Sequence, residues 1–95
     1  MKTMSAKEVE KQYEDLNIID VRETDEVAAG KIPGAVNIPL GLIEFRMNEL
    51  DKSKGYVMVC RSGGRSGQAA QFLEDQGFNV TNMHGGMMNY EGETK

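Results

Sequence analysis

The sequence contains one cysteine, Cys60, which is followed by a loop suited to holding an anion. Two consecutive glycines, Gly63 and Gly64, allow a tight turn in which successive backbone N–H groups point inward. Two arginines, Arg61 and Arg65, add positive charges that do not titrate near neutral pH. Because such surroundings lower the pKa of a thiol, we expect Cys60 to be a thiolate nucleophile beside a site for an anionic substrate.

A lone cysteine also has a simpler interpretation, as a small buried hydrophobic residue at the end of a strand. Such cysteines seldom lie between an apolar strand and a Gly-Gly loop flanked by arginines, so we favour the reactive interpretation. Residues 52–73 carry a charge of +4, whereas the other 73 residues carry −8. The charge distribution alone fits both a local anion site on an acidic protein and a chance cluster on a solvated surface.

The chain has 95 residues, enough for one domain over residues 1–95 with its own core. Its net charge of −4 argues against nucleic acid or an anionic membrane as the main partner. No apolar run of about eighteen residues could span a membrane, and the first residues lack the apolar segment of a signal peptide. With a single cysteine, we expect a cytoplasmic protein without internal disulfides, and a monomer is the default for its small acidic surface.

The loop at Cys60 is expected to join a strand to a helix. Residues 56–60 are all apolar, which indicates a strand buried on both faces, as in a parallel sheet. Residues 66–76 form the clearest helical pattern, with Gly77 at its end. The backbone N–H groups and dipole of this helix would then also favour a thiolate at Cys60.

Strand-like and helix-like segments alternate along the rest of the chain. Further strands are expected over residues 16–21, 35–39 and 78–83, and further helices over residues 5–14, 24–29 and 42–50. Ser5 and Glu8 have the spacing of a capping box, and Thr24 is expected to cap the second helix. In the third helix we expect Leu42 and Phe45, with Met47 and Leu50, to face largely inward.

This alternation predicts an α/β fold, with three α/β/α layers around a central, mostly parallel sheet of four or five strands. Ligands of such sheets bind beyond the carboxyl ends of the strands. Since Cys60 ends a strand that should be central, the fold places it where a site is expected.

Four motifs in order give the chain its resemblance to a single-domain rhodanese, a thiosulfate sulfurtransferase-like protein. They are the strand end at residues 19–23, the turn at residues 30–35, the loop at residues 60–66, and Gly85-Gly86 followed by Tyr90. Lys31 stands where the family usually has His, and Tyr90 where Trp is more usual. The resemblance covers nearly the whole chain and implies a rhodanese-like domain.

The resemblance implies sulfur transfer through a persulfide on Cys60. Cys60 would take the outer sulfur of thiosulfate and pass it to cyanide, a low-molecular-weight thiol or an acceptor protein. The loop amides would hold the outer sulfur of the persulfide, and Arg61 and Arg65 the oxyanion end of the donor. The loop residues of the site would be Arg61, Ser62, Gly63, Gly64, Arg65 and Ser66. No metal and no organic cofactor is implied.

Two other functions remain open. Cysteine-dependent phosphatases and arsenate reductases use a related loop, in which the arginine follows the cysteine after five residues. That position is Ser66 here, and Arg65 comes one residue early, which gives a smaller cradle that suits sulfur better than phosphate. A persulfide carrier or interaction module needs the same cysteine and loop, so the sequence does not separate it from an enzyme.

Outside the Cys60 loop, an acidic and a basic residue, a histidine and two methionines could each serve either the structure or the function. Asp20 and Arg22 have two interpretations: supporting residues near the pocket, or a structural ion pair that holds the strand ends. We favour the structural ion pair. His84 is expected in a turn rather than as a base for Cys60 or a metal ligand. Met87 and Met88 are candidates for an apolar surface that binds an acceptor protein.

Overall fold

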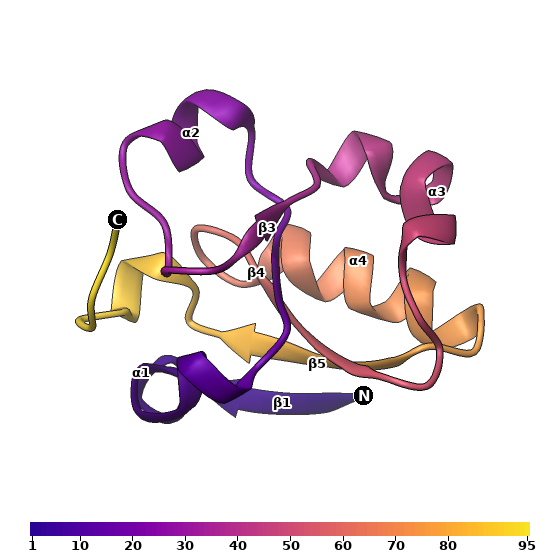
Figure 1. The fold of residues 1–95 in the computed structure, drawn as a ribbon, viewed down its shortest axis with the longest axis horizontal. Helices are drawn as coiled ribbons and strands as arrows, with labels where there is room; N and C mark the ends of the chain where they lie inside the picture. Colours follow the sequence, from indigo (N-terminus) through magenta and orange to yellow (C-terminus); the bar gives the residue numbers. More distant parts are fainter.

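The computed structural model describes all of residues 1–95 and contains one sheet of five strands in the order β1-β5-β4-β2-β3. Every neighbouring pair of strands is parallel (Figure 1). The strands are β1 (Lys2–Ser5), β2 (Ile18–Asp20), β3 (Val36–Asn37), β4 (Gly55–Val59) and β5 (Asn79–His84). The predicted α/β class and parallel sheet are therefore confirmed, with β4 as the central strand.

Helices cover both faces of this sheet. The α-helices are α1 (Ala6–Gln12), α2 (Thr24–Ala28), α3 (Ile43–Arg46) and α4 (Gly64–Asp75). Single 3-10 turns are η1 (Tyr13–Asp15), η2 (Leu40–Leu42), η3 (Met47–Glu49) and η4 (Met87–Asn89). In Figure 1, α4 lies on one side of β4 and β5 and α1 on the other, which gives the three expected layers. None of these helices has the length and hydropathy needed to cross a lipid bilayer.

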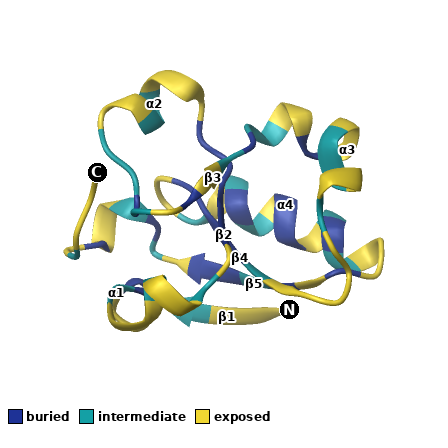
Figure 2. Cartoon of the chain, in the orientation of Figure 1, coloured by how far each residue is buried: buried dark blue, intermediate teal, exposed yellow.

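The central strand β4 and Cys60, which follows it directly, supply side chains to two separate cores. Met58 and Cys60 pack with α3 and α4, whereas Val57 and Val59 pack with α1. All four are buried, and Figure 2 shows the burial concentrated around β4, with α2 largely exposed. The uninterrupted apolar sequence of β4 is thus explained by burial on both faces.

The first two helices, α1 and α2, differ in how well their caps were predicted. Ser5 Oγ accepts the Glu8 N–H at 3.1 Å and Glu8 Oε1 accepts the Ser5 N–H at 2.9 Å, which confirms the capping box of α1. The prediction that Thr24 caps α2 is wrong, because Thr24 is the first helical residue and Glu23 precedes it as the cap. The Glu23 N–H donates to Glu26 Oε1 at 3.0 Å, so a carboxylate one turn later satisfies the free N–H.

The helix predicted over residues 42–50 is wrong in its length and in half of its predicted inward face: Met47 and Leu50 pack partly against the core as expected, but Leu42 and Phe45 do not. The segment is divided among η2, the four-residue α3 and η3, so a 3.6-residue period is not maintained through it. Phe45 is 84% exposed and Leu42 is 43% exposed, whereas Ile43 is buried. The first strand, β1, was not predicted; it lies at the edge of the sheet and pairs only with β5.

Candidate active site

Cys60 lies directly after the central strand and four residues before the start of α4 at Gly64. This is the carboxyl edge of the sheet, where ligands of parallel α/β folds bind. The residue has no exposed surface, whereas Arg61, Ser62 and Gly64 of the loop that follows it are exposed. The thiol is therefore buried at the start of an exposed loop.

Hydrogen bonds from the loop reach the Cys60 sulfur. The Gly63 N–H donates to Sγ at 3.0 Å, and Gly63 has φ of 103°, a left-handed conformation that favours glycine. Burial raises the pKa of the Cys60 thiol. Hydrogen bonding by the Ser66 hydroxyl and by the backbone N–H groups of Ser66, Gly63 and Ser62 lowers this pKa by more than burial raises it. The net effect is a pKa below the ordinary value of a thiol, which favours the nucleophilic thiolate.

A buried asparagine on the neighbouring strand β5 holds two of these loop residues. Asn82 Oδ1 accepts a hydrogen bond from Ser66 Oγ at 2.5 Å, and Asn82 Nδ2 donates to the Gly63 carbonyl oxygen at 3.2 Å. Both Asn82 and Ser66 are buried. Asn82 thus fixes the position of Gly63, whose N–H donates to the Cys60 sulfur, and of Ser66 in the first turn of α4.

The Gly-Gly turn after β5 holds the first part of the loop. The Met87 N–H donates to the Cys60 carbonyl oxygen and the Met88 N–H to the Arg61 carbonyl oxygen, both at 2.9 Å. Gly86 approaches the loop so closely that a Cβ there would lie 2.2 Å from the Arg61 oxygen. The second glycine of the motif is therefore required by the contact between two backbone segments.

The two arginines of the loop have different surroundings. Arg65 donates two hydrogen bonds, of 2.7 and 2.9 Å, to the carboxylate of Glu26 on α2. The side chain of Arg61 is exposed and takes part in no ion pair or hydrogen bond. Of the two positive charges expected to face a substrate anion, one is compensated within the protein.

Asp20 and Arg22 form a buried ion pair at the end of β2. The Arg22 guanidinium donates to both carboxylate oxygens of Asp20, at distances from 2.8 to 3.1 Å, and to the Gly30 carbonyl oxygen at 2.8 Å. The backbone N–H of Arg22 also donates to Asp20 Oδ1. The pair ties the end of β2 to the segment after α2 and makes no hydrogen bond to Cys60.

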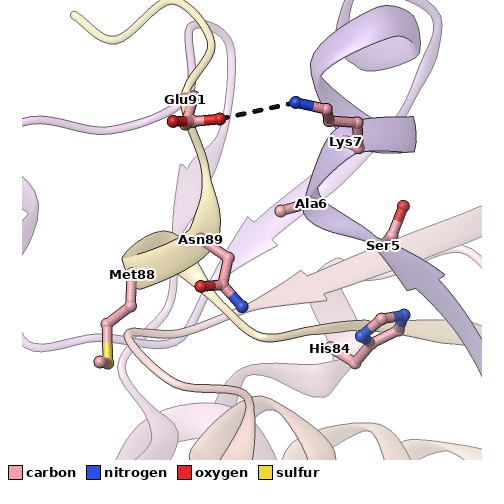
Figure 3. Close-up of a pocket in the computed structure, with 7 residues that line it drawn as sticks. All are labelled: Ser5, Ala6, Lys7, His84, Met88, Asn89 and Glu91. Atoms are coloured by element: carbon pink, nitrogen blue, oxygen red, sulfur yellow. Dashed lines mark ion pairs between the residues drawn. The ribbon is translucent and has the colours of Figure 1, made fainter.

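A separate pocket of about 410 Å³ lies beside the loop, beyond the ends of β1 and β5. Figure 3 shows it between His84 at the end of β5, Met88 and Asn89 of η4, and Lys7 at the start of α1, which is paired with Glu91. Cys60 does not line this pocket or any of the three smaller ones. Met88 is 66% exposed, whereas Met87 packs partly into the core.

Two residues of the site were not singled out in the sequence. Asn82 carried only a weak signal, because β5 also contains Asn79, Thr81 and His84, so one more polar residue in this strand does not stand out. Glu26 carried none, because an acidic residue in the first turn of a helix is ordinary. Only the tertiary structure shows that it faces Arg65.

Fold and loop together define an α/β protein with a candidate nucleophilic cysteine at the carboxyl edge of its sheet. The model of the Rhodanese-like domain family matches residues 5–93. YtwF of Bacillus subtilis, named as a candidate sulfurtransferase, is 52% identical over 98% of this chain and 90% of its own length. A sulfurtransferase of Allochromatium vinosum is 43% identical over 79% of this chain and 71% of its own.

Solved structures show the same fold. SSP1007 of Staphylococcus saprophyticus superposes with a TM-score of 0.91 at 38% identity, over 95% of this chain and 93% of its own. A rhodanese-related protein of Thermoplasma volcanium superposes with a TM-score of 0.95 at 26% identity, over 100% and 98% of the two chains. The chain belongs to the rhodanese-like family, as its motifs indicated.

Proposed function

We propose that this protein is a sulfurtransferase that moves sulfane sulfur from a donor to a thiophilic acceptor through a persulfide on Cys60. The observation that carries the proposal is the hydrogen bond from the Gly63 N–H to Cys60 Sγ, at 3.0 Å. With the Ser62 and Ser66 amides, it supplies donors for a negatively charged sulfur. Relatives named as sulfurtransferases support the same reaction class.

The chemistry is a two-step transfer. The Cys60 thiolate attacks the outer sulfur of thiosulfate, a sulfur–sulfur bond forms at Sγ, and sulfite leaves with the electron pair of the bond that breaks. An acceptor, cyanide or a thiol, then attacks the outer sulfur and regenerates the Cys60 thiolate. Charge is conserved in both steps, and no oxidant or reductant is consumed.

The loop would act mainly through its backbone. The N–H groups of Ser62, Gly63 and Ser66, which act on the Cys60 sulfur, would hold the outer sulfur, and the dipole of α4, which begins at Gly64, would add to their effect. Arg61 is the free cation that would meet an anionic donor. Asp20 and Arg22 would support the site by fixing the end of the strand next to β4.

A persulfide carrier is the second candidate, and one observation favours keeping it. YrkF of Bacillus subtilis, named as a candidate sulfur carrier protein, is 46% identical over 86% of this chain and 45% of its own length. A carrier and an enzyme would load sulfur in the same way. They would differ in whether small acceptors or a specific acceptor protein remove it.

Steady-state kinetics with thiosulfate and cyanide test the proposal. Initial rates at several concentrations of both substrates should give the parallel double-reciprocal lines of a ping-pong reaction, and Cys60→Ser should be inactive while folded. A folded wild-type protein that hydrolyses an aryl phosphate and forms no thiocyanate would favour the phosphatase alternative. Formation of a Cys60 persulfide that cyanide removes only slowly would favour the carrier.

A further inference from the structure

The pairing of Arg65 with Glu26 changes the charge that a sulfur donor meets. Both oxygens of the Glu26 carboxylate are within hydrogen-bond distance of Arg65, at 2.7 and 2.9 Å. Such a bidentate pair has the geometry of the strong arginine–carboxylate interaction. The charge of Arg65 is therefore compensated before any substrate binds.

Glu26 is fixed in this position by its neighbours. The Glu23 N–H donates to Glu26 Oε1 at 3.0 Å, so the carboxylate also completes the N-terminal cap of α2. The Arg65 hydrogen bond holds the pKa of Glu26 at about 2, and the side chain stays ionised at neutral pH.

Sulfane-sulfur donors differ in charge. Thiosulfate carries two negative charges on its reacting group and releases a second dianion, sulfite, whereas the persulfide group of R–S–SH carries at most one negative charge on its two sulfurs and releases a thiol. Charges interact strongly at the short distances within an active site. Each unit of charge beside the Cys60 thiolate therefore changes how readily an anionic donor approaches the thiolate. With Arg65 compensated, Arg61 is the single loop cation left for the donor.

We infer that Glu26 determines donor specificity: by pairing with Arg65 it disfavours dianionic thiosulfate and makes a low-molecular-weight or protein persulfide the better sulfur donor. The inference rests on the proposed Cys60 persulfide. In this reaction the Cys60 thiolate attacks the outer sulfur of R–S–SH and the S–S bond of the donor breaks. The leaving R–S⁻ keeps the electron pair and takes the proton of the donor, which gives R–SH and Cys60–S–S⁻.

The test compares sulfur loading from two donors in single turnover. Reduced protein is mixed with thiosulfate or with glutathione persulfide, and the second-order rate constant of persulfide formation is followed by intact mass. We expect the wild type to load faster from glutathione persulfide. In Glu26→Gln, which keeps an acceptor for the Glu23 N–H, the ratio of the thiosulfate rate to the persulfide rate should rise about ten-fold.

The chain offers a matched control in a second bidentate pair, Arg46 with Glu49, at 2.9 Å for both contacts and away from the loop. Glu49→Gln should leave the ratio unchanged, and thermal unfolding of both variants checks that they are folded. If Glu26→Gln is poorly folded, Glu26→Asp, which keeps the charge but shortens its reach to Arg65, should still raise the ratio, by less than ten-fold, and an unchanged ratio in folded Glu26→Asp would overturn the inference.

The outcomes separate this inference from the proposed function. Loading from both donors with an unchanged ratio in folded Glu26→Gln would overturn the role of Glu26 and leave the Cys60 persulfide intact. An equal rise with both donors would show that the pair restricts access rather than charge, and would also overturn it. No loading of the wild type from either donor would instead overturn the proposed function itself.

Discussion

Asn82 Oδ1 accepts a hydrogen bond from Ser66 Oγ at 2.5 Å, and this contact links strand β5 to the side chain that acts on the Cys60 sulfur. The same asparagine holds the Gly63 carbonyl, so the two hydrogen bonds fix both ends of the segment that turns into α4. A buried side chain that satisfies two loop groups at once gives the loop a single conformation.

Removing the Ser66 hydroxyl should raise the pKa of Cys60. The hydroxyl is one of the groups that lower this pKa, and Ser66→Ala leaves burial, which raises it, in place. The rate of alkylation by iodoacetamide as a function of pH should show a midpoint at higher pH than in the wild type. The variant should also be less stable by about 1–3 kcal/mol, because Asn82 Oδ1 loses its buried donor.

The control for this measurement is Ser62→Ala. Ser62 is exposed and acts on Cys60 through its backbone N–H, which alanine retains. Its alkylation midpoint should equal that of the wild type. A Ser66→Ala midpoint that also equals the wild type would show that the hydroxyl does not act on the sulfur.

Substituting the second glycine of the Gly-Gly turn should displace the active-site loop. In Gly86→Ala the new Cβ meets the Arg61 carbonyl oxygen at 2.2 Å, and a residue with φ of 61° costs a further ~1–3 kcal/mol in backbone strain. We expect a lower free energy of unfolding in urea and slower persulfide formation. Gly41→Ala is the control, since a Cβ there has open space, and it should change neither quantity. Normal loading by Gly86→Ala would refute the required close approach.

Breaking the ion pair of Asp20 and Arg22 should act through stability. Arg22→Met leaves the Asp20 carboxylate buried without its partner, which typically costs about 3–5 kcal/mol. Urea denaturation should show this loss, while the fraction that remains folded should load sulfur at close to the wild-type rate. Arg46→Met, which breaks an exposed pair, should cost less than about 1 kcal/mol. A stable Arg22→Met protein that fails to load sulfur would point to a direct role in the reaction.

The contact between Arg65 and Glu26 should make stability depend on pH in acid. The pKa of Glu26 is lowered from its ordinary value of 4.5 to about 2 in the folded protein. A lowered pKa contributes stability that is complete above 4.5 and is lost as pH falls toward 2. The difference in free energy of unfolding between the wild type and Glu26→Gln should therefore be constant near neutral pH and shrink between pH 4.5 and 2. A difference that does not vary over this range would contradict the contact.

Much of the fold could be predicted from the sequence, because the local sequence patterns and the observed burial of side chains indicate the same helices and strands. The capping box at Ser5, the apolar run of β4 and the Gly-Gly loop each have a direct physical meaning, and together they placed Cys60 at the carboxyl edge of a parallel sheet. Tertiary contacts decided the rest. Strand β1 is held by its pairing with β5 at the sheet edge, and its four residues carry no strong pattern of their own.

The prediction failed where a regular period was assumed. Phe45 was expected to face inward in a helix over residues 42–50, but the chain there forms single turns of different pitch, which rotate Ile43 inward and Phe45 outward. At the site, the position of Arg65 was predictable and its partner was not. The two residues of that pair are 39 positions apart, and neither has a local feature that identifies the other.

The most direct test of the account is the intact mass of the protein after treatment with a sulfur donor. Freshly reduced protein is incubated with glutathione persulfide or with excess thiosulfate, freed of donor and weighed by mass spectrometry. The account predicts a gain of about 32 Da, one sulfur atom, that disappears on addition of cyanide and is absent in Cys60→Ser. A folded wild-type protein that gains no sulfur from either donor, or gains it equally in Cys60→Ser, would contradict it.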